Sequence, residues 1–361
     1  MSRLPVVDLT QLHATSTTRT DALAELARIC RDVGFFYLTG HGLSQAQLDA
    51  MLALGRDFFA LPDSEKRAIQ MRHSPHFRGY SGIAAELTRG RPDQREQFDI
   101  MREELAPATR HAPWQGLIGP NQWPAAMPQL KPLLLAFQQQ LSDLAQNLLT
   151  HLLASLELPS DALASTYQAG PYLHTKLLRY PAVPNLASPH EAQRQGVGAH
   201  KDPGYLTFVL GDSEAGLEVE TDTGWLLVEP LPGALVVNIG ELLELATDGY
   251  LKATTHRVTS PGTGDRYSLA FFMAAQLDAQ VPVLQLPDTF KALTPGISTD
   301  PDNPLLRDVG MNTLKGRLRS HPDVAAAHYS ELDIAANGTS ASTTGQGQHS
   351  SDTTPGVAHA A

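Results

Sequence analysis

The chain has 361 residues, which is enough for two average domains or for one large enzyme with a single core. Lys and Arg number 27 against 38 Asp and Glu, a formal net charge of -11. This balance argues against a general binder of nucleic acid or of anionic membranes, because such surfaces need clustered positive charge. The single cysteine, Cys30, excludes an intrachain disulfide and a thiolate cluster, so a metal must be held by His, Asp or Glu.

Membrane spans and secretion signals are not predicted either. No apolar run approaches the roughly 20 residues that cross a bilayer, and the opening Met1-Ser2-Arg3-Leu4-Pro5 lacks the apolar core of a secretory signal. We therefore expect a cytoplasmic protein whose partner is a small molecule, with no nucleic-acid or membrane partner. Nothing in the sequence indicates an oligomeric state.

The first 120 residues combine strand patterns with helical ones. Residues 4–9 and 33–38 are short apolar or aromatic runs of the kind found in strands. Between them, apolar residues that include Cys30 recur at helical spacing, and a second helix is predicted over residues 44–59. We interpret residues 1–120 as an N-terminal region of helices and strands.

The longest periodic stretch lies between residues 127 and 156, where leucines and one phenylalanine recur at steps of one, three and four. It predicts one long helix, entered near Pro132, that packs against a sheet.

After Gly170 the pattern changes to short strands separated by Gly, Pro or Asp turns, at residues 205–210, 216–220, 225–228 and 234–239. No helical pattern separates them, which favours an antiparallel barrel or jelly roll over a doubly wound parallel sheet. Strand aromatics such as Phe272 are expected to pack in the barrel core. We interpret residues 121–335 as this core. The low-complexity residues 336–361 are predicted to be disordered, because they bury too little apolar surface to offset the entropy of ordering.

A His and an Asp stand two positions apart in Gly198-Ala199-His200-Lys201-Asp202, at what looks like the start of a strand. Side chains at positions i and i+2 of a strand share a face, so the imidazole and the carboxylate could reach one ion. His256 lies in another strand-like run far along the chain. Two imidazoles and one carboxylate form the facial triad of non-haem Fe(II) oxygenases, which leaves coordination positions open for substrates. We predict a metal site at His200, Asp202 and His256.

A second pair of polar residues follows in the run Arg266-Tyr267-Ser268. Arg266 and Ser268 share a strand face while Tyr267 points the other way, so a guanidinium and a hydroxyl can converge on one carboxylate. Arginine suits this task because its planar fork matches a carboxylate and stays charged at any working pH. A dicarboxylic ketoacid would fit, with one end chelating iron and the other held by this pair.

These elements resemble those of the iron and 2-oxoglutarate dependent dioxygenases, in the isopenicillin N synthase-like branch of that superfamily. Further segments match family patterns in the family's order: residues 4–9, Gly34-Phe35-Phe36-Tyr37, Gly40-His41-Gly42, Phe77-Arg78-Gly79-Tyr80, Leu178-Arg179-Tyr180-Pro181 and Val237-Asn238-Ile239-Gly240-Glu241. Each motif alone is weak, but the ordered set is specific, and it covers roughly residues 4–290.

The resemblance implies a mainly β fold with α-helices, in which N-terminal helices wrap a double-stranded β-helix (jelly roll) core. It implies an enzyme that uses Fe(II), 2-oxoglutarate and O2 to oxidise a C-H bond of a small molecule, with succinate and CO2 as coproducts. The implied site residues are the iron ligands His200, Asp202 and His256 and the 2-oxoglutarate contacts Arg266, Ser268 and Tyr180.

The alternation of side chains along a strand adds further candidate residues to the site. Lys176 and Tyr180 share a face of one predicted strand, so Lys176 should face the cavity if Tyr180 does, while Arg179 points away. Lys176 is therefore a candidate to hold an anionic part of the prime substrate. In relatives the loop at residues 77–93 lies over the iron, which adds three candidate substrate contacts, Arg78, Tyr80 and Glu86.

Other functions stay open at this point. An isopenicillin N synthase-like oxidase would use no 2-oxoglutarate yet carries the same Arg-x-Ser pair, and an enzyme of the ethylene-forming type would fragment 2-oxoglutarate itself. A zinc hydrolase could use the same three ligands, but it would leave Arg266 and Ser268 unexplained and lacks an obvious general base. A non-catalytic binding jelly roll is the remaining alternative.

Overall fold

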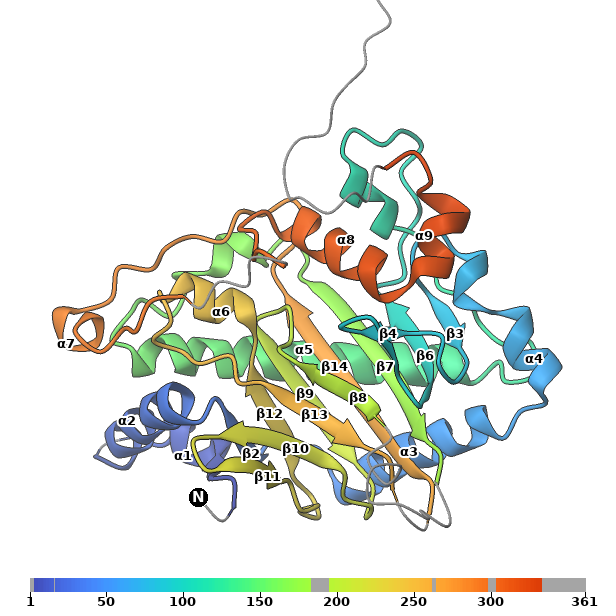
Figure 1. Ribbon diagram of the computed structural model, residues 1–361. Coiled ribbons are helices and arrows are strands. Elements are labelled where there is room, and N and C mark those ends of the chain that lie inside the picture. The colour runs from blue at the N-terminus through green and yellow to red at the C-terminus, as the bar shows by residue number, and fades with distance from the viewer. Residues whose placement is uncertain (1–2, 16, 183–194, 262–263, 298–302, 333–361) are drawn as a thin grey trace, which may run out of the picture.

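The computed structural model describes residues 3–15, 17–182, 195–261, 264–297 and 303–332 (Figure 1). The predicted disordered tail, residues 336–361, lies outside this part of the chain. Within the described ranges, no helix has the length and apolarity needed to cross a membrane.

An eight-stranded sheet forms one layer of the molecule. Its strands run in the order β1 (Val6–Asp8), β2 (Phe35–Thr39), β12 (Leu235–Ile239), β9 (Leu206–Gly211), β14 (Arg266–Ala274), β7 (Tyr172–Tyr180), β6 (Glu96–Met101) and β3 (Gly79–Ser81). All neighbours are antiparallel except β1 and β2. Four of the six strands from the first 120 residues extend this sheet at its two ends, so the predicted N-terminal region and the predicted core share one sheet.

A four-stranded antiparallel sheet lies over the large one, in the order β11 (Gly224–Leu227), β10 (Leu217–Thr221), β13 (His256–Thr259) and β8 (Gln195–His200) (Figure 1). Apolar side chains of both sheets meet between the layers, among them Leu178 of β7, Val219 of β10 and Val258 of β13. Two facing, mostly antiparallel sheets with a shared apolar interior confirm the predicted jelly roll.

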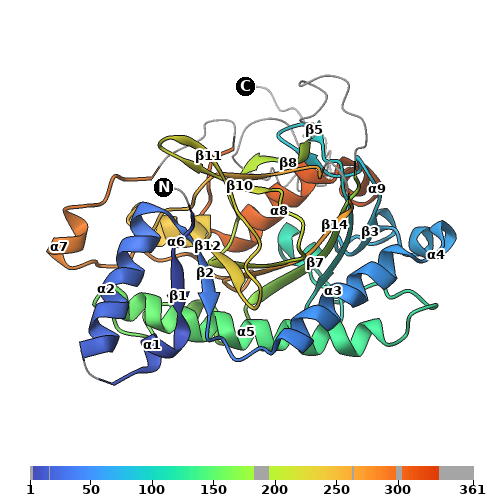
Figure 2. The same cartoon turned by 90° about the horizontal axis from the view of Figure 1, so that it is seen from below.

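Helices cover the outer face of the large sheet, as Figure 2 shows for α5 (Leu130–Ser155) with α1 (Leu9–His13), α2 (Thr17–Asp32) and α3 (Gln45–Phe59) beside it. The long helix predicted over residues 127–156 is α5, whose leucines join a core cluster with Leu177 and Phe271 of the sheet. Ser44 and Gln47 form a capping box that starts α3 where a helix was expected. Cys30 is buried on α2.

Two elements stand at the open end of the barrel: α8 (Val309–Ser320), whose first turn is capped by Asp308, and the hairpin of β4 (Leu87–Thr88) and β5 (Arg91–Pro92). Residues of both line the cavity described below. The remaining helices are α4 (Asp63–Ala68), α6 (Glu241–Ala246), α7 (Asp288–Lys291) and α9 (Pro322–His328), with short 3-10 turns at Met71–His73, Pro113–Leu117 and Ala164–Thr166.

Candidate metal centre

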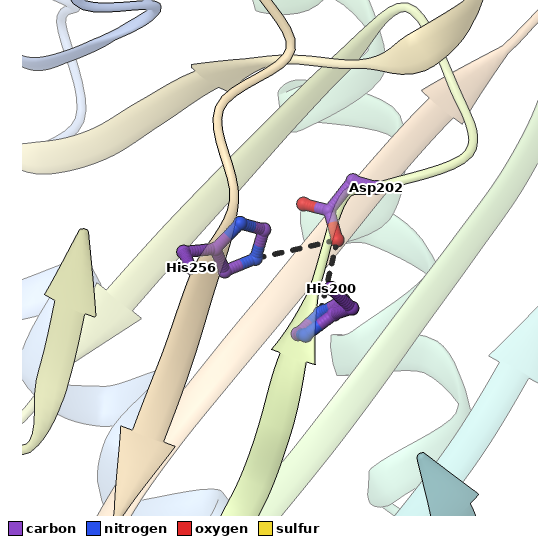
Figure 3. A group of neighbouring side chains, drawn as sticks. All are labelled: His200, Asp202 and His256. Atoms are coloured by element: carbon purple, nitrogen blue, oxygen red, sulfur yellow. Dashed lines mark ion pairs between the residues drawn. The ribbon is translucent and has the colours of Figure 1, made fainter. Parts of the chain in front are cut away.

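Three side chains from distant parts of the sequence meet at one end of the barrel (Figure 3). His256 is the first residue of β13 and pairs with His200, the last residue of β8; Asp202 follows two residues later. The Nε2 atoms of His200 and His256 lie 3.4 and 3.5 Å from Oδ1 of Asp202. The prediction that this motif starts a strand is wrong. The strand ends at His200, and the backbone beyond it brings Asp202 beside both rings.

Outer partners orient all three side chains. The Nδ1 atoms of His200 and His256 lie 2.8 and 3.1 Å from main-chain carbonyl oxygens. A carbonyl can only accept a hydrogen bond, so each Nδ1 carries a proton and Nε2 is the nitrogen left to bind a metal. Oδ2 of Asp202 accepts a hydrogen bond from Nδ2 of Asn238 at 2.9 Å. Metal sites use such partners to fix the tautomer and direction of their ligands.

The charge of Asp202 also suits a metal ligand. Burial alone would raise the pKa of Asp202, but the neighbouring His256 and His200 lower it well below its usual range, so the carboxylate is ionised. Across the described ranges, these three residues are the one group of His, Cys, Asp or Glu side chains close enough to share an ion, with ligand atoms within 4.8 Å of one another. Two imidazoles and a carboxylate fit Fe(II).

The triad opens into a cavity of about 540 Å³, which Arg266 and Ser268 also line. Arg266 is buried; its Nε donates to the carbonyl oxygen of Glu214 at 3.2 Å and its Nη1 to Oγ of Ser268 at 3.4 Å. Tyr267 does not line the cavity and packs its ring against α3. The predicted alternation along this strand is therefore confirmed. Tyr180 pairs with Arg266 across β7 and β14, and its ring centre lies 5.1 Å from the guanidinium carbon.

The strand parity predicted for β7 is also confirmed. Lys176 and Tyr180 line the cavity, whereas Arg179 points away and bonds Glu96 and Asp265 at 2.6 and 2.8 Å.

Lys176 and Glu86 meet in the cavity wall. Nζ of Lys176 lies 3.0 and 3.1 Å from the two carboxylate oxygens of Glu86, which accepts a further hydrogen bond from Arg95 at 2.6 Å. The structure thus brings two of the four predicted substrate contacts to the cavity.

Arg78 and Tyr80 are not brought there, and neither lines the cavity. Arg78 is 1% exposed, and its guanidinium donates to the carbonyl oxygens of Arg102 and Leu117 at 2.8 and 2.9 Å. The hydroxyl of Tyr80 donates to Glu96 at 2.5 Å. Both side chains are used to join the loop to the protein interior, so their prediction as substrate contacts is corrected.

Sequence analysis missed a buried group of charges behind and beside Lys176, which we call the charge network: Glu86, Arg95, Asp99, His174, Lys176 and Arg317. Asp99 is fully buried; it accepts a hydrogen bond from Nε2 of His174 at 2.6 Å and lies 3.5 Å from Nη1 of Arg317 and 3.7 Å from Nζ of Lys176. One signal was available, a charged residue inside the apolar run Phe98-Asp99-Ile100. Arg317 on α8 lies in no recognised motif.

Burial, together with the nearby positive charge of Arg317, lowers the pKa of His174 to about 3 and that of His321 to about 4, so both rings are neutral. Neutral His174 can donate from Nε2 to Asp99 and accept at Nδ1 from Nη2 of Arg317, 2.9 Å away. Phe272, expected in the core, instead lines the cavity and stacks on His174 with ring centres 5.1 Å apart.

Basic side chains outnumber acidic ones among the described residues that line the cavity, although the chain as a whole is acidic. Its acidic lining residues are Glu86, Asp202 and Glu241, and its basic ones are Arg89, Arg95, Lys176, Lys201, Arg266, Lys315, Arg317 and Arg319. Asp93, Asp99 and Glu244, which lie outside the lining, pair with several of these basic residues, but the basic side chains still outnumber the acidic ones. This remaining excess favours ligands that carry carboxylates.

Comparison with known families gives two matches. Residues 4–126 match the family described as the N-terminal part of the non-haem dioxygenase in morphine synthesis, and residues 172–275 match the 2OG-Fe(II) oxygenase superfamily. The segment that carries α8 lies beyond both matches.

Individual relatives agree with these matches. The 2-oxoglutarate-dependent dioxygenase frbJ of Dothideomycetidae sp. (strain 11243) is 32% identical over 89% of this chain and 90% of its own length. Homoarginine-6-hydroxylase 2-ODD-C23.1 of Arabidopsis thaliana is 31% identical over 78% of this chain and 88% of its length. A crystal structure of a 2OG-Fe(II) oxygenase family protein from Caulobacter crescentus superposes with a TM-score of 0.69 at 28% identity, covering 87% of this chain and 98% of that one.

Proposed function

The chain belongs to the 2OG-Fe(II) oxygenase superfamily and is a 2-oxoglutarate-dependent dioxygenase, and on that premise we propose which of its residues hold each component. His200, Asp202 and His256 hold Fe(II). The 2-oxoglutarate contacts are Arg266, Ser268 and Tyr180, of which the first two hold the distal carboxylate and the third adds a phenolic hydrogen bond. The observation that carries this proposal is that the triad and the buried Arg266–Ser268 pair line one cavity.

Bound iron, with 2-oxoglutarate and O2, supplies the oxidising power for a substrate C-H bond, and succinate and CO2 are the coproducts. The protein itself holds the ligands of the ion and of the cosubstrate in position. The carbonyl-bonded Nδ1 atoms keep the Nε2 atoms of His200 and His256 directed at the ion, and Asn238 holds the carboxylate of Asp202. Arg266, already bonded to Glu214 and Ser268, needs little ordering to receive a carboxylate.

The prime substrate is a small molecule with at least one carboxylate. The cationic lining supports this class, and Lys176 with Glu86 beside it is the proposed contact. Several relatives are named as homoarginine-6-hydroxylases, and homoarginine is itself a small carboxylate.

We propose the following division of the chain within this family. Residues 1–120 form an N-terminal region that adds helices and edge strands, residues 121–335 form the oxygenase core, and residues 336–361 form a disordered low-complexity tail. A cytoplasmic location is proposed from the composition, because a lone thiol such as Cys30 is typical of a reducing compartment.

The test is a screen of amino acids and small carboxylated metabolites, scored by succinate release that requires both O2 and the added compound. The expected result is at least one compound that stimulates succinate formation and is itself oxidised. Oxidation without 2-oxoglutarate would instead indicate an isopenicillin N synthase-like oxidase. Ethylene in the headspace without any added compound would indicate fragmentation of 2-oxoglutarate.

A further inference from the structure

A second carboxylate, Glu241, stands at the rim of the triad. Glu241 is the first residue of α6; its main-chain nitrogen donates to the carbonyl oxygen of Asp202 at 2.8 Å, and it lines the cavity. A Cβ atom on the preceding Gly240 would lie 2.2 Å from the carbonyl oxygen of Gly204. The start of α6 is therefore pressed against the loop that carries Asp202, which fixes the position of Glu241 relative to the triad.

Glu241 differs from its acidic neighbours in what it binds. Glu244, on the same helix, accepts from Nζ of Lys201 at 2.9 and 3.1 Å, and Glu86 is bonded by Lys176 and Arg95. Within the described part of the chain, the half-buried carboxylate of Glu241 accepts no hydrogen bond and forms no ion pair within 4 Å, and the positive charges of Lys201 and Lys315 act on it only from a longer distance. Its acceptor capacity is open to a ligand in the cavity.

Partial burial without a partner is unfavourable for a carboxylate, because hydration is lost and no protein donor replaces it. A ligand that brings a cationic donor would restore the missing interaction. Most of the remaining charged residues of the lining are basic, so a ligand with positive charge alone would be repelled elsewhere in the cavity. The lining therefore favours a ligand with both charges, its anion held away from Glu241.

We propose that Glu241 is a specificity-determining residue that binds an ammonium or guanidinium group of the prime substrate, while basic side chains elsewhere in the cavity wall hold its carboxylate. The substrate is then an amphoteric, amino-acid-like molecule. The inference rests on the proposed function, since it assumes that this cavity is where the prime substrate is oxidised.

The first measurement is binding without turnover. Calorimetry on the anaerobic protein with Fe(II) and 2-oxoglutarate would cover the proteinogenic amino acids together with ornithine, homoarginine and citrulline. The tightest ligand is then compared with analogues that lack one charged group. For L-arginine these are L-citrulline, which lacks the guanidinium, 5-guanidinopentanoate, which lacks the α-ammonium, and agmatine, which lacks the carboxylate. Loss of the carboxylate, or of whichever cation Glu241 binds, is expected to weaken binding on the order of tenfold or more.

The second measurement assigns the cation to one side chain. Glu241→Gln keeps the size and removes the charge, and it should reduce the preference for the cationic ligand over its neutral analogue to about twofold. Glu241→Asp keeps the charge and should retain part of that preference. Affinity for 2-oxoglutarate should not change in either variant. Glu220→Gln, on an exposed position of β10, is the matched control and should behave as wild type.

The outcomes separate the two proposals. A wild-type protein that binds 2-oxoglutarate and Fe(II), but no amphoteric compound more tightly than roughly 1 mM, overturns the inference alone. An unchanged cation preference in Glu241→Gln overturns it as well. If the folded wild-type protein binds no 2-oxoglutarate, the proposed site assignment is wrong, and this inference is wrong with it.

Discussion

From the charge network we predict that the stability of the folded protein depends strongly on the carboxylate of Asp99. Asp99→Asn keeps the shape of the side chain and an acceptor oxygen for His174, but removes the negative charge that faces Lys176 and Arg317 at 3.7 and 3.5 Å. Asp99 is fully buried, and removing one partner from a buried ionic group costs about 3–5 kcal/mol, since the remaining charges stay buried. The free energy of unfolding should fall by that amount.

For a chain of this size the unfolding entropy is roughly 0.7 kcal/mol/K, so this loss corresponds to a fall in Tm of about 4–7 °C. Differential scanning calorimetry would measure it. The matched control is Glu25→Gln, which breaks the exposed pair between Glu25 and Arg28 and should lower Tm by about 1 °C or less. A double variant of Asp99→Asn with Arg317→Gln should lose less than the sum of the single losses. If Asp99→Asn lowers Tm no more than the control does, the stability of the protein does not depend on this carboxylate and the reasoning is refuted.

Three further predictions concern the cosubstrate site and pH. Arg266→Ala should raise the KM for 2-oxoglutarate roughly 10- to 150-fold through loss of a charge-assisted pair, measured by succinate release; an unchanged KM would contradict its role. Tyr180→Phe removes one hydroxyl and should raise the same KM only roughly two- to tenfold, while an effect as large as that of Arg266→Ala would show that the ring is misplaced. The pKa values of His174 and His321, about 3 and about 4 in the folded protein, lie below the ordinary value of 6.5, so the unfolded chain binds more protons between these limits. Stability should therefore fall as pH drops from about 6.5 toward 4, by about 1.4 kcal/mol per pH unit for each histidine, and chemical unfolding that shows no such fall would contradict their buried neutral state.

Local sequence patterns were sufficient for much of the site. The alternation rule placed Lys176 and Tyr180 toward the cavity and Arg179 away from it, because both faces of a paired strand are fixed by its register. The same rule placed Arg266 with Ser268. For the metal motif, the structure brings the predicted residues together by a route that the alternation rule did not describe. His200 and Asp202 meet through a turn after β8 rather than along a strand.

The errors arise where contacts depend on distant parts of the chain. Nothing near Arg78 in the sequence indicates that its guanidinium bonds the carbonyl oxygens of Arg102 and Leu117, which are 24 and 39 residues away. Arg317 reaches Asp99 across 218 residues from a helix without a motif. Periodicity describes one element at a time, so it could not predict which helix covers the open end of the barrel.

The central claim is that His200, Asp202 and His256 hold one ferrous ion to which 2-oxoglutarate binds. Anaerobic addition of Fe(II) and 2-oxoglutarate should give the visible metal-to-ligand charge-transfer band in the wild type and in Asp222→Ala, an exposed control. Asp202→Ala should fold yet give no band. A band of wild-type intensity in Asp202→Ala, or none in well-folded wild type, would contradict the account.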